Sequence, residues 1–367
     1  MTRSSAPFLP GKPPSCALPT TAQVATTDGY FSSGQSPGRR LHLVGPGQVG
    51  RRFLQQLATA DQGERTFTIV AISDSSGSVF ARDGLDVAAV LAHNQRGAAI
   101  AQLPGAEAIP ADVAIGVVGA DLVVDATPSS AAGTEAALAR GRAALRTGAF
   151  LALCGKNALA AAAAEWLLPP LRGRVGINAV LGGAGRQLVS ELDELRAHCR
   201  SLALCGNVTT TVIVQAIERG ASVAAGIEHA RQLGLLEPDP TLDLNGSDAA
   251  VKLVAVHGAV FGERWLRAPE PATIARADVR SLDPGVVRER TRRGATTRLI
   301  ARADRQGALR VAFEEVPASS PLAAPPDRVV YTYELPTGVR VHTGLGVGYD
   351  RTAQALLADV LAAEVCS

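Results

Sequence analysis

The hydrophobic residues in the first half of the chain predict strands that alternate with helices. Four short, mostly apolar segments have the length of strands: residues 41–44, 66–73, 122–125 and 149–153. Between them, apolar positions recur at helical spacing over residues 51–60 and about 131–146. The segment 66–73 is almost continuously apolar, as expected of a parallel strand that helices cover on both faces. This alternation predicts an α/β fold with a Rossmann-type, doubly wound parallel sheet.

A different pattern begins after Ile177 and predicts a second, α+β domain. The Gly-rich run 178–185 precedes a helical segment over 187–199, and further helical segments with polar faces continue to Gly262. Three β-rich stretches follow, at residues 297–303, 309–314 and 329–335. We expect these stretches to form a sheet that the preceding helices cover.

Length and composition support two folded domains and exclude several classes of protein. At 367 residues, with 47% hydrophobic and 19% charged residues, the chain is longer than one average domain and is not generally disordered. Its net charge of +2 is not gathered into a long basic block, which argues against nucleic acid as a partner. The alanine-rich segment 158–168 is interrupted by Glu165 and is shorter than the about 20 apolar residues that span a membrane, so we expect no membrane partner.

The cysteines and the N-terminal segment bear on where the protein resides. The cysteines are odd in number and show no CxxC spacing, so they suggest neither a disulfide framework nor a zinc site, and we expect a cytoplasmic protein. Residues 1–39 are rich in Ser, Pro, Thr and Gly and lack the apolar core of a secretion signal. We expect a disordered tail here, with a transit peptide as the alternative.

A glycine-rich turn after the first strand predicts a nucleotide site. Gly45, Gly47 and Gly50 form G-x-G-x-x-G directly after a strand and at the start of a helix. The first glycine allows a tight turn, the second lets the backbone approach a pyrophosphate, and the third allows close helix packing. Free N–H groups at the helix start, where Gln48 and Val49 lie, would bind the anion.

The residue at the end of the second strand bears on which nicotinamide cofactor binds. Asp74 could accept hydrogen bonds from the ribose hydroxyls of NAD, and it would repel the 2′-phosphate of NADP. Arg51 and Arg52, at the start of the first helix, could instead hold that phosphate together with neighbouring serines, or could simply be exposed. The sequence therefore predicts an NAD or NADP site and leaves the choice open.

A carboxylate-rich segment of the second domain could carry chemistry. Glu237, Asp239, Asp243 and Asp248 lie in a loop that contains Pro and Gly, and this loop opens an apolar helix with Lys252. Asp248 and Lys252 are four positions apart, so on one helix they lie one turn apart and can pair. Spacing alone does not distinguish this pair from a surface ion pair, which contributes little.

The run ARQLGLLEPDPTLDLNGSDAAVKL, residues 230–253, resembles the signature segment of homoserine dehydrogenases. That segment has the general form A-x-x-L-G-Y-x-E-x-D-P-x-x-D-(x)-x-G-x-D-x-x-x-K. Further segments agree in order: GPGQVG, AISDSSG, DATPSS, Lys156 after the fourth strand, NAVLGGAG, GNVTTT and GLGVGYDRTAQALLADVL. The resemblance extends over roughly residues 40–362.

The resemblance implies a domain organisation and a homodimer. It implies a nucleotide-binding domain over 40–177, a catalytic and dimerisation domain over 178–343, and a C-terminal segment, 344–367, that returns to the nucleotide-binding domain. Members of the family are usually dimers through the sheet of the second domain. Few residues flank the matching segments, so we expect a monofunctional protein with neither a C-terminal ACT domain nor an upstream kinase domain.

The resemblance also assigns roles to residues. Lys252, Asp248 and Lys156 would be catalytic, with Lys252 exchanging a proton with the substrate oxygen and Lys156 close to the cofactor or the reacting group. The residues that would bind the amino-acid substrate are Glu237, Asp243, Asp248 and Thr209. The residues that would line the cofactor cleft are Gly45, Gly47, Gln48, Val49, Gly50, Asp74, Thr127, Lys156, Gly234, Gly344, Gly346 and Gly348. A monovalent cation would bind at Asn178, Leu181, Gly183 and Gly185, mainly through backbone carbonyls.

Four positions depart from the family pattern and leave the substrate open. Leu235 replaces Tyr, Val208 and Thr211 replace Gly and Asn, and Arg186 stands in place of Pro. The implied reaction is the NAD(P)-dependent interconversion of L-aspartate 4-semialdehyde and L-homoserine, in threonine and methionine biosynthesis. The alternatives are an oxidoreductase for another amino-acid semialdehyde or hydroxy acid, and a nucleotide-binding paralogue without turnover.

Overall fold

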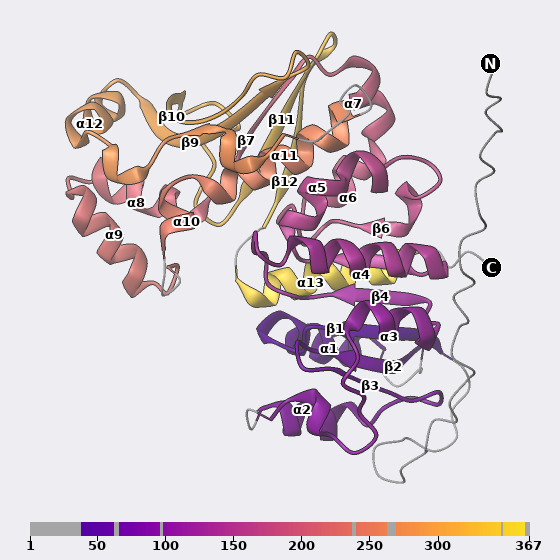
Figure 1. Cartoon of the computed structure of the whole chain (residues 1–367). Coiled ribbons are helices and arrows are strands. Elements are labelled where there is room, and N and C mark those ends of the chain that lie inside the picture. Colours follow the sequence, from indigo (N-terminus) through magenta and orange to yellow (C-terminus); the bar gives the residue numbers. More distant parts are fainter. Residues whose placement is uncertain are drawn as a thin grey trace, which may run out of the picture.

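The computed structural model describes six stretches of the chain: residues 38–61, 66–95, 98–236, 240–262, 269–345 and 348–363. The predictions for residues 1–37, Glu237 and Gly346 lie outside these stretches. Two six-stranded sheets, each with its own layer of helices, occupy different parts of the molecule (Figure 1). The predicted α/β fold class, with a Rossmann-type sheet and a second α+β unit, is confirmed.

The first sheet has the predicted parallel arrangement. Its strands are β1 (Arg39–Val44), β2 (Phe67–Ser73), β3 (Ser78–Phe80), β4 (Leu122–Asp125), β5 (Phe150–Leu153) and β6 (Val175–Gly176). Their order is β3-β2-β1-β4-β5-β6, and all run parallel except β3, which forms an antiparallel hairpin with β2. From β1 the sheet extends first to β2 on one side and then to β4 on the other. A crevice therefore lies at the carboxyl ends of β1 and β4, where such sheets bind ligands.

Helices cover both faces of the first sheet. On one face α1 (Gln48–Asp61) packs against α13 (Tyr349–Ala362), so two helices that are far apart in the sequence lie side by side (Figure 1). Phe53 of α1 and Leu356 of α13 share a core with Leu41 and Leu43 of β1. The other face is covered by α3 (Ala111–Val118), α4 (Thr134–Thr147) and α5 (Lys156–Trp166).

The second sheet is mainly antiparallel. Its strands are β7 (Ser201–Cys205), β8 (Ala275–Arg276), β9 (Ala295–Asp304), β10 (Leu309–Pro317), β11 (Val329–Leu335) and β12 (Gly338–Gly344). Their order is β12-β11-β7-β9-β10-β8, and only the β8–β10 pair among these strands is parallel. The helices of this part are α8 (Val208–Glu218), α9 (Val223–Gln232), α10 (Thr241–Leu244), α11 (Ser247–Phe261) and α12 (Pro284–Arg292). Shorter or bridging helices are α2 (Val87–Gln95), η1 (Ile100–Gln102), η2 (Arg172–Arg174), α6 (Gly185–Ser190), α7 (Leu192–His198), η4 (Pro271–Thr273) and η5 (Val279–Ser281).

The two parts are joined by close packing of α5 against α11. Small residues permit the approach: a Cβ atom at Gly258 would lie 3.1 Å from Cβ of Ala163, and one at Gly262 would lie 2.6 Å from Cβ of Ala164. The alanine-rich segment 158–168 is thus mostly a buried helix rather than a surface one. Because α5 and α11 carry Lys156 and Lys252, this packing fixes the relative position of the two lysines.

One predicted helix is two helices in the structure. The segment 187–199 forms α6 and α7, with a break at Glu191, so the single-helix prediction was wrong. At the break, Glu191 Oε2 accepts hydrogen bonds from Arg340 Nη1 at 2.6 Å and from His342 Nε2 at 3.1 Å, both from β12. The contact that accompanies the break is therefore tertiary and has no signature in local periodicity.

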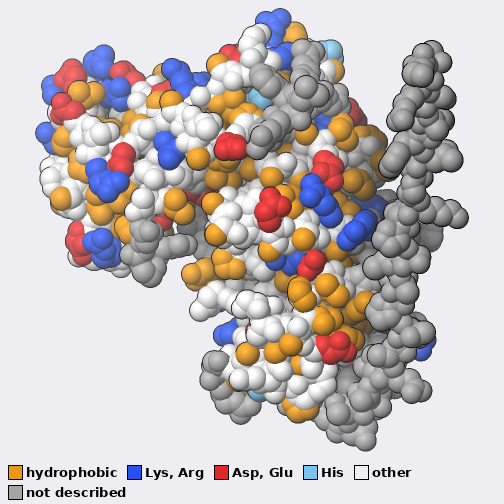
Figure 2. Space-filling model, viewed as in Figure 1, with side chains coloured by type: hydrophobic (Ala, Val, Ile, Leu, Met, Phe, Trp, Pro, Cys, Tyr) orange, Lys and Arg blue, Asp and Glu red, His pale blue; other side chains and the backbone are white. Residues whose placement is uncertain are grey.

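The surface shows no large area of one charge sign on the face in Figure 2, where acidic and basic side chains are interspersed. This distribution agrees with the small net charge of the sequence. Among the helices that the structure describes, we find none with the length and apolar character needed to cross a bilayer.

A pair of helical glycines tests the packing of α4 against α5. A Cβ atom at Gly141 would lie 2.5 Å from Cη2 of the fully buried Trp166, whereas one at Gly116 of α3 would meet nothing within 4 Å. We expect Gly141→Ala to cost about 1–3 kcal/mol by overpacking, which exceeds the gain of up to about 1 kcal/mol in helix propensity. The control, Gly116→Ala, should be neutral or stabilising. Thermal unfolding measures both, and a Gly141→Ala variant as stable as Gly116→Ala would contradict the packing described.

Candidate active site

A cavity of about 980 Å³ opens at the carboxyl ends of β1 and β4. This volume is at the upper end of the range of about 300–1,000 Å³ that is common for ligand sites. The lining comes from the glycine turn after β1, the end of β2, the loops after β4 and β5, and the start of α13. Gly47 and Lys252, which are far apart in the sequence, both line it. The cavity therefore connects the nucleotide turn with the second part of the chain.

The three glycines of the turn each meet a different steric requirement. Gly45 has a left-handed φ of 88°, and a Cβ atom there would lie 3.0 Å from the backbone of Ala126 and Thr127. A Cβ atom at Gly50 would lie 2.2 Å from the carbonyl oxygen of Gly45, whereas Gly47 has open space around it. Gly47 thus leaves room for a ligand beside the start of α1, whose first N–H groups can bind a pyrophosphate. These residues fit a dinucleotide.

Asp74 and Arg51 both line the cavity beyond the turn. Asp74 Oδ1 accepts hydrogen bonds from the backbone N–H and the hydroxyl of Ser76, at 2.7 and 2.5 Å. Arg51 Nη2 donates to Asn94 Oδ1 at 2.6 Å. Arg52 instead forms an ion pair of 2.9 Å with Asp350 and is not part of the lining. Of the predicted arginine pair, Arg51 is thus the one that faces the cofactor cavity.

At the other end of the cavity, Asp248 is shared by two lysines. Its Oδ1 lies 2.7 Å from Lys156 Nζ, and its Oδ2 lies 2.9 Å from Lys252 Nζ. Lys252 Nζ also donates to the carbonyl oxygen of Gly206, at the end of β7, at 2.7 Å. The side chains of Lys252 and Asp248 are 11% and 17% exposed, so the pair is not an ordinary surface ion pair.

The shared carboxylate controls the charge state of the site. Burial alone would raise the pKa of Asp248, but the two ammonium groups and their hydrogen bonds lower it well below its usual value, so the carboxyl is ionised near neutral pH. The negative charge of Asp248 in turn raises the pKa of Lys156, although burial opposes this. The ionised carboxylate of Asp248 thus lies between the side chains of two lysines.

The use of lysine at this site is selective. The chain has 36 basic residues, of which only Lys12, Lys156 and Lys252 are lysines. Apart from Lys12, arginine serves for all the other basic residues, yet both basic residues on Asp248 are lysines. A guanidinium does not release its proton in a protein, whereas an ammonium can. The two basic residues on Asp248 are therefore of the kind that can exchange a proton.

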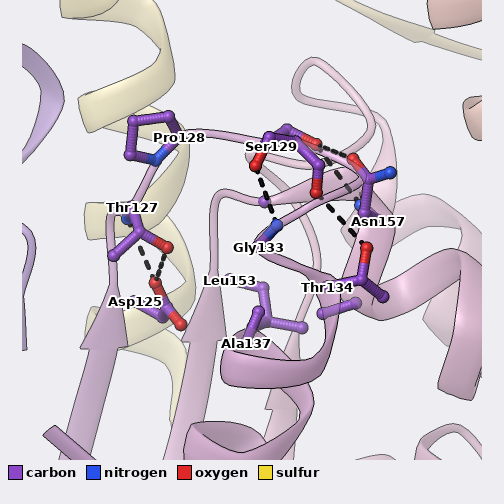
Figure 3. A pocket seen from close by; sticks show the side chains of 12 residues that line it. Asp125, Thr127, Pro128, Ser129, Gly133, Thr134, Ala137, Leu153 and Asn157 are labelled. Atoms are coloured by element: carbon purple, nitrogen blue, oxygen red, sulfur yellow. Dashed lines mark hydrogen bonds between the residues drawn. The ribbon is translucent and has the colours of Figure 1, made fainter. Parts of the chain in front are cut away.

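The start of α5 is fixed by the loop after β4. Ser129 Oγ accepts hydrogen bonds from the backbone N–H groups of Lys156 and Asn157, at 2.9 and 3.3 Å, and donates to Asn157 Oδ1 at 2.6 Å. Figure 3 shows Ser129 pointing toward Asn157, near Asp125 and Thr127. The DATPSS segment thus positions the backbone of the lysine that meets Asp248.

Sequence comparisons agree with this geometry. The homoserine dehydrogenase family profile matches residues 189–361, and the profile of Glutamate/Leucine/Phenylalanine/Valine dehydrogenases matches residues 21–164. A homoserine dehydrogenase of Methanocaldococcus jannaschii is 28% identical over 332 residues, which cover 87% of this chain and 96% of the relative. The NAD(+)-dependent homoserine dehydrogenase of Pseudomonas canavaninivorans is 30% identical over 349 residues, covering 88% of this chain and 95% of the relative. The chain belongs to the homoserine dehydrogenase family.

Solved structures of similar fold carry the same family name. A putative homoserine dehydrogenase from Archaeoglobus fulgidus superposes with a TM-score of 0.72 at 22% identity, over 88% of this chain and 98% of that one. A hyperthermophilic archaeal homoserine dehydrogenase in complex with NADPH superposes with a TM-score of 0.69 at 20% identity, over 89% of this chain and 98% of that one. At these identities the superpositions support the fold.

Two predicted substrate residues of this homoserine dehydrogenase family member lie outside the cavity lining. Thr209, in α8, is buried and donates from its hydroxyl to the carbonyl oxygen of Leu235 at 3.1 Å. Asp243, in α10, helps to raise the pKa of Lys156, so its charge acts on the site. Their direct contact with substrate stays a prediction.

The residues predicted for the cofactor cleft fall into two groups. Gly45, Gly47, Gln48, Val49, Asp74, Thr127 and Lys156 line the cavity. Gly50, Gly234, Gly344 and Gly348 do not. A Cβ atom at Gly344 would lie 2.1 Å from the carbonyl oxygen of Gly182, which does line the cavity, and Gly348 directly precedes Tyr349 at the cavity wall. Gly50, Gly344 and Gly348 therefore adjoin the lining, whereas Gly234 ends α9 in open space.

Two of the four carbonyls predicted for a monovalent cation, those of Asn178 and Leu181, already accept hydrogen bonds. The oxygen of Asn178 accepts from the N–H of Gly183 at 2.8 Å, and that of Leu181 accepts from the hydroxyl of Tyr331 at 3.3 Å. Gly185 packs tightly, since a Cβ atom there would lie 2.4 Å from the carbonyl oxygen of Ile177. Within the described ranges, no group of three or more His, Cys, Asp or Glu residues could hold a metal ion. Cation binding stays a prediction.

Arg140 and Tyr349 line the cavity but were not singled out from the sequence. Cys154 also lines the cavity. Burial raises the pKa of the Cys154 thiol to about 11, so this cysteine is a protonated packing group near neutral pH. Tyr349 could have been suspected from its place after GLGVG, whereas Arg140 lies in an ordinary amphipathic helix and gave no local signal.

The effect of Asp248 on Lys156 can be measured directly. In Asp248→Asn the charge that raises the pKa of Lys156 is lost, so this lysine should release its proton at lower pH than in the wild type. Competitive acetylation followed by mass spectrometry reports the unprotonated fraction of Lys156 across pH. Asp193→Asn, which removes a carboxylate that is 76% exposed, is the matched control. An unchanged labelling profile in Asp248→Asn would contradict the coupling described.

Proposed function

We propose that the chain is a homoserine dehydrogenase that interconverts L-aspartate 4-semialdehyde and L-homoserine with NAD or NADP. The observation that carries this proposal is the cavity that joins the glycine turn to the Asp248-linked lysines. The 30% identity to an NAD(+)-dependent homoserine dehydrogenase over most of both chains supports the same reaction. A bound nicotinamide would supply or accept the hydride.

The residues of the chain would provide the proton and the binding charges. In the reducing direction, Lys252 Nζ would donate a proton to the oxygen of the aldehyde as the alkoxide forms, and in the oxidising direction it would receive that proton. Asp248 would hold Lys252 Nζ in place. Lys156 would attract the carboxylate of the amino acid, and the acidic residues Asp243 and Glu237 would attract its ammonium group.

The departures from the family pattern do not favour another substrate. Leu235 packs beside the buried apolar cluster of α8, and Thr211 donates to the carbonyl oxygen of Asn207 at 2.9 Å. Arg186 donates to the carbonyl oxygen of Ala358 at 3.3 Å. Neither these residues nor Val208 belong to the described lining of the cavity. A panel of related semialdehydes tests the alternative, because turnover of a relative without turnover of aspartate 4-semialdehyde would favour it.

The cellular setting is proposed from the same resemblance. We propose a cytoplasmic homodimer that acts in threonine and methionine biosynthesis, and that associates through the sheet of the second domain. The three cysteines that the structure describes, Cys154, Cys199 and Cys205, are free thiols, which suits a reducing compartment. Val339 and Val341 of the edge strand β12 are exposed, at 62% and 37%, and could take part in association.

Homoserine oxidation by the wild-type protein, assayed separately with NAD and NADP, tests the proposed activity. Lys252→Arg keeps a cation beside Asp248 but cannot release a proton, so we expect kcat to fall by about 10²- to 10⁴-fold. Binding of NADH or NADPH, followed by fluorescence, should stay close to that of the wild type because Lys252 is remote from the glycine turn. Wild-type kcat in Lys252→Arg would contradict the assigned role, and absence of any wild-type turnover would contradict the proposed function.

Cofactor choice should depend on Arg51. Arg51 lines the cavity together with Asp74, so its removal should weaken binding of NADPH more than that of NADH, because only NADPH carries the 2′-phosphate. Fluorescence titrations of Arg51→Ala with both nucleotides measure this ratio. Arg52→Ala, which removes the neighbouring arginine outside the lining, is the control. Equal weakening of both nucleotides in Arg51→Ala would assign Arg51 no part in the choice.

A further inference from the structure

The loop after β4 places the hydroxyl of Thr127 between a carboxylate and a guanidinium. Thr127 Oγ1 lies 2.5 Å from Asp125 Oδ1 and 2.8 Å from Arg140 Nη2. Arg140 Nε donates to the second oxygen, Asp125 Oδ2, at 2.8 Å, which closes a ring of three hydrogen-bonded groups. The ion pair is buried, with side-chain exposures of 12% for Arg140 and 2% for Asp125. The proton transfer proposed for the lysines does not account for this buried ring of hydrogen bonds.

The donor and acceptor roles in this ring are forced by its charges. A carboxylate only accepts hydrogen bonds and a guanidinium only donates them, whereas a hydroxyl has one proton and two lone pairs. Thr127 must therefore give its proton to Asp125 and use one lone pair for Arg140. Its backbone N–H also donates to Asp125 Oδ1, at 3.1 Å. The Thr127 hydroxyl has one lone pair left for a ligand, so it can bind a donor and cannot bind a phosphate oxygen.

Thr127 lies between the two ends of the cavity. On one side, its backbone N is 3.0 Å from the position of a Cβ atom at Gly45, in the glycine turn. On the other side, the same loop continues to Ser129, which binds the backbone of Lys156. Thr127 and Arg140 both line the cavity. Suppose that the pyrophosphate of a dinucleotide lies at the turn and that its reactive ring faces Lys252. The nicotinamide riboside half of that dinucleotide must then lie beside Thr127.

We propose that Arg140 is a positioning residue: through its ion pair with Asp125 it locks the Thr127 hydroxyl as a hydrogen-bond acceptor for the nicotinamide riboside half of the cofactor. The donors available on that half are the carboxamide NH₂ and the ribose hydroxyls. This inference rests on the proposed function because it assumes that a nicotinamide nucleotide occupies the cavity. It adds a recognition element to the cofactor site that is distinct from the glycine turn.

Binding of NADH and NADPH to the full chain, measured by calorimetry or fluorescence without substrate, tests the proposal. We expect Thr127→Val to weaken binding by about 3- to 10-fold, the effect of one hydrogen bond, and Thr127→Ser to restore it. Arg140→Met should give a similar loss because it frees the Thr127 hydroxyl from its fixed orientation. Thr127→Val with Arg140→Met should give no additional loss, because Arg140 acts only through that hydroxyl. Arg142→Met is the matched control on the same helix, since Arg142 forms an exposed pair with Glu165.

The donor on the cofactor is identified with the 3-acetylpyridine analogue of NAD, in which a methyl group replaces the carboxamide NH₂. A carboxamide donor predicts that the wild type binds the analogue more weakly than NAD and that Thr127→Val binds both alike. A ribose donor predicts that Thr127→Val weakens both equally. If Arg140→Met does not fold, Arg140→Lys is the second variant. Lysine keeps the charge but lacks the two guanidinium nitrogens that reach both Asp125 and Thr127, so it should show the same loss of binding.

Two results would overturn the inference. The first is wild-type binding in both Thr127→Val and Arg140→Met. The second is additive losses in the double variant, which would mean that Arg140 contacts the cofactor itself. Homoserine oxidation by the same wild-type sample separates this inference from the proposed function. If the wild type turns over and the variants bind the cofactor normally, only the inference is refuted. If the variants lose binding as expected but the wild type does not turn over, only the proposed function is refuted.

Discussion

The ion pairs that Asp248 forms with two lysines from different helices are the interaction on which the site depends. Lys156 begins α5 in the first part of the chain, and Lys252 lies on α11 in the second. Two buried ammonium groups would repel each other without the carboxylate between them. Asp248 therefore holds Lys252 beside Lys156, and it also joins α5 of the first part of the chain to α11 of the second.

The fold supplies the rigidity that this arrangement needs. Small residues such as Gly258 and Gly262 let α11 lie close against α5, so the lysines they carry cannot move apart without opening a packed core. On the nucleotide side, the return of α13 to α1 adds Tyr349 and Thr352 to the wall of the cavity. The cavity is thus built from segments that are far apart in the sequence, and apolar contacts hold these segments together along with the ion pairs of Asp248.

Local signals were enough to predict much of the fold, and they failed where tertiary contacts decide. The apolar segments of β1, β2, β4 and β5 and the glycine turn were identified because their patterns are local. The short hairpin strand β3 was not identified. The break at Glu191 was not identified either, since it is accompanied by contacts to β12. In the site, family resemblance indicated Lys156, Asp248 and Lys252, but no pattern indicated that Lys156 pairs with Asp248 or that Arg140 reaches Thr127.

We expect Lys252 to face the reacting atoms across the cavity from the glycine turn. A crystal structure of the protein with NADP and L-homoserine would show this arrangement. The nicotinamide ring should lie between Thr127 and Lys252, with Lys252 Nζ within hydrogen-bonding distance, about 3 Å, of the hydroxyl oxygen of homoserine. A homoserine hydroxyl bound away from Lys252, or a dinucleotide bound outside the cavity, would contradict it.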